Sequence, residues 1–306
     1  MRSFRVVTIA VLAAAGCSPG PVPAPPSPSP ETTAGVPAAD ADTAGADAGA
    51  PLDLDAQARA AWAGRVDRTA LGRAIDCWLR LSESRPDDPK PLLALSRAYV
   101  TLADFHVRAP ADMPQRADAL ERAIDTAERA LLASSPAFSA AVKRGVSIEE
   151  AVKSVEADKM EALAVYGTSL AHYGVDKGFT ALLMYRGRLV AAMQRVIEIA
   201  PKTEHAAADR ELGTFFARVP GFAGGDLARA REHFDKALGL APEVLVTKLR
   251  YAEAYAIEAK NRELFARLLA EIKAADAGEA DLAPDNLLVK RRADLLAASI
   301  DDLFAR

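Results

Sequence analysis

The stretch ARAREHFDKALGLAP, residues 228–242, decides how this chain folds. Ala230, Phe234 and Ala237 are spaced four and three residues apart, and Pro242 follows five residues later. Small residues where two helices touch, a large residue between them and a closing proline are typical of the second helix of a tetratricopeptide-like unit of about 34 residues. The stretch therefore predicts one helix of a paired-helix repeat.

The same spacing recurs in AIDCWLRLSESRP, residues 74–86. Its matching positions are Ala74, Trp78, Leu81 and Pro86, and the first helices that follow each unit carry Leu92, Leu95, Ser96 and Tyr99, or Tyr251, Ala252 and Tyr255. The match is weaker around 120–136, where the proline arrives one place late. Because apolar residues recur three and four apart and no alternating strand pattern is present, we predict an all-α fold. We expect a divergent TPR-like helical-hairpin array with extended inter-helix loops.

One unit carries an oversized loop, VPGFAGGD, residues 219–226. Gly213 and Ala230 hold its two tight positions and lie 17 residues apart, about five more than the repeat requires. Glycine permits backbone angles that other residues avoid, and Asp226 can cap the next helix. The loop glycines concerned are Gly221, Gly224 and Gly225. We expect this loop to line the mouth of a cavity or to dock on a neighbouring subunit.

Aromatic residues gather where the chain departs from the repeat, although they form only 6% of it. The candidate cavity residues are Phe215, Phe216, Phe222, Tyr166, Tyr173 and Tyr185. One interpretation is that they line an apolar ligand cavity, since ligand pockets are mostly hydrophobic. The other is that they anchor a glycine-rich loop against the helices, and both interpretations remain open on the sequence alone.

The N-terminal segment, residues 1–17, has basic residues, an apolar run and small residues that end at Cys17. That layout is typical of a secretory signal, and AAGC resembles a bacterial lipobox. We therefore predict a lipidated Cys17 and a periplasmic protein anchored to a bacterial membrane by its N-terminal lipid. Ser18 favours the outer membrane. The alternative is a plain signal peptide with a chance cysteine.

Residues 18–50 are rich in Pro, Ala, Gly, Ser and Thr and have no aromatic residue. Such a composition buries too little apolar surface to fold, so we predict a disordered tether followed by a helical domain over 51–306. That domain has 36 basic and 38 acidic residues, and no basic stripe indicates nucleic acid as a partner. Cys77 has no second cysteine in the domain and is expected to be a small core residue.

Catalytic and metal-binding patterns are not evident. The four histidines, His106, His172, His205 and His233, lack the spacing of metal ligands, and solvated or core-edge positions are expected for them. The adjacent carboxylates Glu149–Glu150 and Asp301–Asp302 are expected to be solvated. We predict no catalytic residue, no metal and no cofactor, and an enzyme is the least supported of the functional classes.

Taken together, the predicted lipoprotein layout and the stretch ELGTFFARVPGFAGGDLARAREHFDKALGLAP, residues 211–242, resemble the T-component (TatT) family of TRAP transporters. The resemblance implies a periplasmic homotrimer that works with a TRAP-type solute-binding protein. It also implies a cavity for a hydrophobic small-molecule ligand, with or without a carboxylate, but assigns no individual contacts. The alternative is a scaffold lipoprotein that holds protein partners of an envelope assembly in a concave groove.

Overall fold

The computed structural model describes residues 53–305, which form fourteen α-helices and no strand. The all-α prediction is therefore confirmed for the described part of the chain. The predicted signal, the lipidated Cys17 and the tether lie outside the described residues. Among those that are described, no helix is long and apolar enough to cross a membrane.

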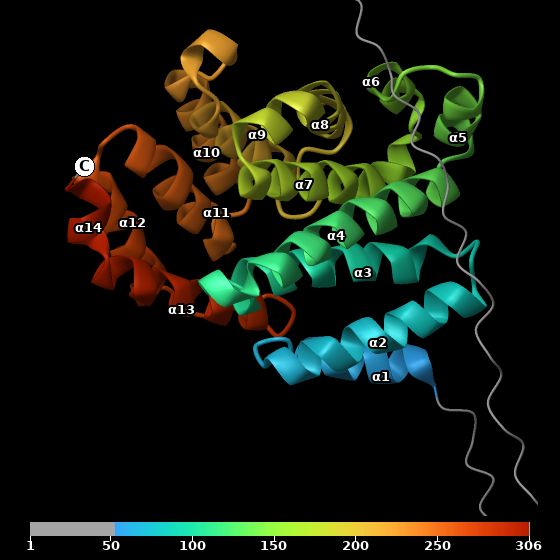
Figure 1. The fold of residues 1–306 in the computed structure, drawn as a ribbon, viewed down its shortest axis with the longest axis horizontal. Helices are drawn as coiled ribbons and strands as arrows, with labels where there is room; N and C mark the ends of the chain where they lie inside the picture. The colour runs from blue at the N-terminus through green and yellow to red at the C-terminus, as the bar shows by residue number, and fades with distance from the viewer. Residues whose placement is uncertain (1–52, 306) are drawn as a thin grey trace, which may run out of the picture. The chain divides into compact units, whose positions relative to one another are not determined.

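Successive helices pack as hairpins, as the array predicted from the sequence requires (Figure 1). The paired helices are α1 (Leu54–Ala63) with α2 (Arg68–Ser84), α3 (Pro89–Thr101) with α4 (Met113–Ser134), α7 (Met160–Lys177) with α8 (Phe179–Ile199), and α9 (Ala207–Arg218) with α10 (Leu227–Leu240). The C-terminal helices are α11 (Leu245–Arg250), α12 (Arg262–Ala274), α13 (Ala283–Ala298) and α14 (Ile300–Phe304).

The segments that connect the hairpins contain shorter helices and helical turns. The helices α5 (Pro136–Lys143) and α6 (Ile148–Ala151) connect α4 to α7, and 3-10 turns cover Pro110–Asp112, Val152–Ser154, Ala157–Lys159 and Gly221–Ala223. Two π-helical turns, η1 (Leu102–His106) and η6 (Tyr251–Ala256), continue α3 and α11. These extended connections agree with the predicted departure from a uniform solenoid.

The repeat positions found in the sequence are packed as expected. Ala230, Phe234 and Ala237 are fully buried, and a Cβ placed on Gly213 would lie 3.0 Å from the ring of Phe234. Gly213 therefore lets α9 approach α10 closely, which is the role of the tight position. The ring of Tyr251 stacks on Phe234 at 4.7 Å and ties the next unit to this pair.

Prolines mark most helix ends, with one exception. Pro86, Pro201 and Pro242 each follow a helix within two residues, and Pro136 opens α5 directly after α4 ends. Pro284 differs from these prolines, because it stands in the first turn of α13 and does not follow a helix end. The missing proline N–H has no helical partner at that position, so proline is tolerated there.

The loop between α9 and α10 is braced at its base. Asp226 caps α10, as expected, by accepting hydrogen bonds from Ala228 N and Arg229 N. Gly224 has a φ of 96°, a left-handed angle that favours glycine. A Cβ on Gly225 would lie 1.6 Å from Val219 O, so only glycine permits this backbone approach.

Candidate functional site

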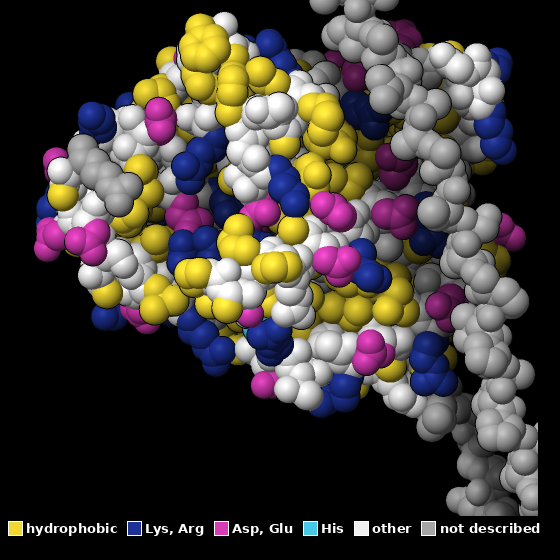
Figure 2. All heavy atoms as spheres, in the orientation of Figure 1, with side chains coloured by type: hydrophobic (Ala, Val, Ile, Leu, Met, Phe, Trp, Pro, Cys, Tyr) yellow, Lys and Arg dark blue, Asp and Glu magenta, His cyan; other side chains and the backbone are white. Residues whose placement is uncertain are grey.

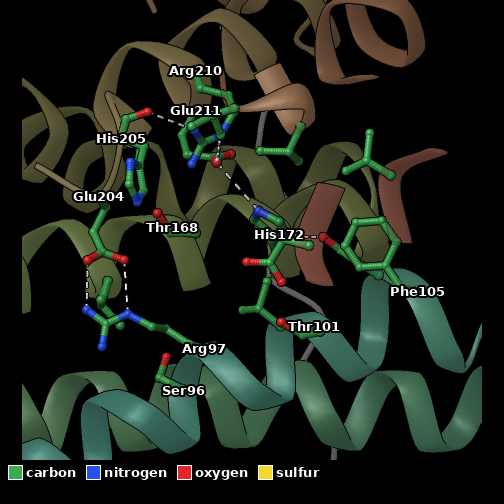
Figure 3. Close-up of a pocket in the computed structure, with 18 of the residues that line it drawn as sticks. Ser96, Arg97, Thr101, Phe105, Thr168, His172, Glu204, His205, Arg210 and Glu211 are labelled. Carbon is green, nitrogen blue, oxygen red and sulfur yellow. Dashed lines mark hydrogen bonds and ion pairs between the residues drawn. The ribbon is translucent and has the colours of Figure 1, made fainter. Parts of the chain in front are cut away.

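A cavity of about 180 Å³ lies where α3, α7 and α9 meet the segments that begin α11 and α13. Its apolar lining residues, which we call its apolar side, are Trp62, Val100, Phe105, Val165, Val244, Val246, Leu282 and Val289. Its polar lining residues, which we call its polar side, include Ser96, Arg97, Thr101, Asp104, Thr168, Ser169, His172, Glu204, His205, Arg210, Glu211, Asp285 and Asn286. Figure 3 shows these polar side chains converging from helices far apart in the sequence.

The π-helical turn η1 places part of this lining. Val107 N donates to Leu102 O, a bond across five residues that widens the helix by one residue relative to an α-helix. Asp104 and Phe105 lie within this turn and both line the cavity. Because π-helical turns occur often at functional sites, this local irregularity is consistent with a binding role.

The second π-helical turn, η6, directly follows Arg250, the residue at the centre of a buried ion cluster. Arg250 donates to Asp104 of the first π-helical turn and lies 3.4 Å from Glu253 of the second. Asp104 also lies 2.9 Å from His172 Nδ1, and His172 Nε2 is 3.5 Å from Glu211. The cluster therefore connects α7, α9 and both π-helical turns beneath the polar side of the cavity.

The charges of this cluster hold one another in their ionised forms. Burial alone would lower the pKa of His172, but the neighbouring Asp104 and Glu211 carboxylates raise it to about 9. Burial alone would raise the pKa of Asp104, but Arg250 and His172 lower it well below its usual range. Buried ions are tolerated when they are paired in this way, so at neutral pH the cavity floor consists of charged groups that already have partners.

At the other end of the cavity, Arg97 and Glu204 form a two-bond ion pair, with N···O distances of 3.0 and 2.7 Å (Figure 3). Glu204, His205 and Ala206 have consecutive positive φ angles of 51°, 55° and 57°. Such angles are uncommon for residues other than glycine, and each costs about 1–3 kcal/mol. Backbone strain of this kind is concentrated at functional sites. Here the strained segment contains Glu204 and His205, which both line the cavity.

A contact between the two ends of the described chain completes the lining. Arg65, after α1, forms two bonds of 2.7 and 3.0 Å with the carboxylate of Asp285 in α13. Its guanidinium also donates to Asp281 O at 2.6 Å and lies 4.3 Å from the centre of the Trp62 ring. These contacts of Arg65 bring together Trp62 and Asp285, which both line the cavity. The two residues are more than 200 positions apart in the sequence.

The aromatic residues proposed from the sequence are not part of this lining. Phe215, Phe216 and Tyr166 are buried in the core, while Tyr173 and Tyr185 are partly buried and pack edge to face. Phe222 is 88% exposed. The loop therefore does not form the mouth of this cavity, and a ligand role for these six side chains or for the loop residues Gly221, Gly224, Gly225 and Asp226 stays a prediction.

Sequence reasoning missed the polar residues that do line the cavity. None of them belongs to a recognisable sequence motif, and histidine was expected at solvated or core-edge positions, whereas the His172 side chain is only 9% exposed. A usable signal was present, because Val165, Ser169 and His172 recur at the spacing of one buried helix face. A polar residue on such a face needs partners from other helices, and only the fold identifies them.

A protein-family model with the description TRAP transporter T-component matches residues 70–304. The matched range contains every residue of the cavity lining except Trp62. The comparison with curated proteins gave no match.

Proposed function

Since this chain belongs to the T-component family of TRAP transporters, we propose that its cavity binds a small solute for such a transporter. That family is a transporter component family and not an enzyme family. The observation that carries the proposal is a cavity of about 180 Å³ whose lining combines apolar and polar side chains. Such a combination suits a hydrophobic solute that bears a polar group, a carboxylate included.

The apolar side would hold the body of the solute. Val100, Val165, Val246 and Val289 come from four different helical segments and face one space. Removal of apolar surface from water contributes about 25 cal/mol per Å², so this side would supply most of the binding free energy. The polar side would then set the orientation of the solute, as a few well-placed polar groups do in ligand sites.

The polar side supports binding rather than chemistry. Asp104, Glu204 and Glu211 are each held by a cation of the protein, namely Arg250, Arg97 and Arg210 or His172. Groups already paired in this way are poor candidates for a nucleophile or a general base, which needs an available proton position near the substrate.

The location, oligomeric state and partner of the protein can be proposed from its family. We propose that the protein works in the periplasm as a homotrimer, held at a bacterial membrane by lipid on Cys17, and exchanges its solute with a TRAP-type solute-binding protein. The lipobox-like residues before Cys17 and the Pro-rich segment 18–50 support the anchor and its tether.

The binding proposal is tested by filling the cavity. Thr168 lies on its polar side, so Thr168→Trp should occupy the space of the solute, whereas Thr69→Trp adds the same ring at an exposed position in the first turn of α2. Native mass spectrometry of the full-length protein, purified from membranes, reports the bound small molecule and the subunit count.

We expect a bound solute in the unaltered protein and in Thr69→Trp, and its loss in Thr168→Trp. Retention of the solute in Thr168→Trp would place binding elsewhere. Preparations that never contain a small molecule, even after incubation with lipophilic acids, would contradict the proposal as a whole.

A further inference from the structure

An exposed apolar surface surrounds the start of α8 and the loop before α10. Its members, which we call the α8 tip, are Phe179, Leu183, Met184, Phe222 and Leu227, with exposed fractions of 38%, 38%, 65%, 88% and 37%. Figure 2 shows hydrophobic side chains along the upper edge of the molecule, where Figure 1 draws the segment that joins α9 to α10. Exposed apolar groups that gather in this way mark interaction sites more often than isolated ones do.

Contacts between the two segments make the α8 tip one surface. The rings of Phe179 and Phe222 pack at 5.8 Å, and Leu183 lies one helical turn after Phe179 on the same face. One further turn along, Arg186 donates to Ala223 O at 3.1 Å. The loop therefore lies along this face of α8, while Leu183 and Met184 stay uncovered beside it.

The loop is organised to present Phe222 rather than to bury it. Its base is closed by hydrogen bonds from Gly225 N to Pro220 O at 3.1 Å and from Asp226 N to Phe216 O at 3.0 Å. A Cβ on Gly225 would lie 1.6 Å from Val219 O, so the backbone is closely packed at the base of the loop. A braced loop that holds a phenylalanine at 88% exposure contributes little to the core, so its apolar tip requires another explanation.

Three basic residues lie close to the α8 tip along the chain or by contact, although one of them, Lys177, is paired with Glu121. Arg186 lies within the contact just described, Lys177 sits 5.5 Å from the Tyr173 ring one turn before it, and Arg229 follows in the first turn of α10, over the Phe216 ring. Two nearby carboxylates are already engaged, since Asp226 caps α10 and Glu121 lies 3.5 Å from Lys177. A third, Glu149, lies beside Gly187 further along α8.

From this combination we propose that the α8 tip docks on the surface of an anionic lipid bilayer. Aromatic and aliphatic side chains enter the boundary between headgroups and acyl chains, while Lys and Arg remain at the phosphates. Five apolar residues cannot reach the area of about 800 Å² per partner that a stable protein–protein interface needs, so a second copy of the chain is a poorer fit. The proposal does not depend on the cavity or on its solute.

The docking contact is weak by itself and suits a domain that is already held near the membrane. A lipid at Cys17, as proposed above, would make the contact intramolecular and raise its effective concentration. Docking would then fix how the tethered domain faces the bilayer, an orientation that the predicted 33-residue tether alone would leave free.

The test measures insertion of the tip itself. The full chain with Phe222→Trp is reconstituted on vesicles of phosphatidylethanolamine and phosphatidylglycerol that contain brominated acyl chains, which quench indole fluorescence on contact. Leu295→Trp, at an equally apolar position of α13 that is 63% exposed, is the matched control for a ring outside the α8 tip. The unaltered protein gives the background quenching of the native indoles of Trp62 and Trp78.

We expect quenching of the Phe222→Trp indole to exceed that of Leu295→Trp about fivefold on anionic vesicles, and to fall on pure phosphatidylcholine vesicles or when Arg186→Ser is added. Equal quenching of the two variants would overturn the proposal. So would a quenching signal that ignores lipid charge, or loss of the subunit assembly in Phe222→Ser without any lipid contact, which would assign the surface to a neighbouring copy.

Discussion

The loop at 218–226 and the cavity floor both depart from regular repeat packing, yet they do so in opposite ways. The loop is conspicuous in sequence, with a proline, a phenylalanine and three glycines, and its tip lies in solvent. The ion cluster at the cavity floor is inconspicuous in sequence, since Asp104, His172 and Arg250 are single polar residues of helices. In the structure their side chains are at most 13% exposed, and they are paired with one another.

Unusual composition therefore marks unusual backbone geometry, whereas a binding site requires the burial of polar groups that compact packing usually excludes. Gly224 and Gly225 are required by local geometry, namely a left-handed φ angle and a close backbone contact. The ion cluster depends on tertiary contacts, because buried charges need partners on other helices. If this contrast holds, loss of a charge from the cluster should destabilise the fold more than a change in the loop.

The largest effect is expected from Arg250→Met. Removal of this cation takes one partner from each of the buried carboxylates Asp104 and Glu253, which keep His172 and Arg292 nearby, and should lower the free energy of unfolding by about 3–5 kcal/mol. Arg262→Met is the control, since Arg262 pairs with Asp301 where both side chains are more than half exposed, and its loss should cost less than about 1 kcal/mol. Urea unfolding measures both, and equal losses would remove the distinction between the two pairs.

A rise in pH should lower the free energy of unfolding by a smaller amount. Because the pKa of His172 is raised from 6.5 to about 9, its protonated form stabilises the fold fully below pH 6.5. This contribution, about 3 kcal/mol, is lost as the pH rises through 9. Unfolding midpoints at pH 6.5 and 9.5 should therefore differ more in the unaltered protein than in His172→Gln, in which the group is absent. The same pH dependence in both proteins would contradict this role of His172.

The smallest effect is expected in the loop. Gly225→Ala places a methyl group against Val219 O, so the loop base must shift at a cost of about 2 kcal/mol. Gly221→Ala meets no atom within 4 Å and should change stability by less than about 0.5 kcal/mol. Thermal unfolding of the two variants checks this pair, and equal melting temperatures would show that the loop base is not rigid.

Much of the fold could be predicted because its signals are local. The spacing of Ala230, Phe234 and Ala237 indicates which helix face is buried, and the cap at Asp226 depends on residues two and three positions away. The candidate site could be predicted far less well. The aromatic residues drew attention through composition, but Phe215 and Tyr166 are buried in the core, where large apolar side chains are stable without any ligand.

The amino-acid sequence alone determined the helical periods, the α3–α4 and α9–α10 pairs and the family to which the chain belongs, since each of these depends on residues within a few turns of one another. Tertiary structure alone decided where the cavity lies. Arg65 and Asp285, or Asp104 and Arg250, are more than 140 positions apart along the chain. Their pairing is set by the way the hairpins stack, because a buried charge is stable only beside the partner that this stacking brings to it.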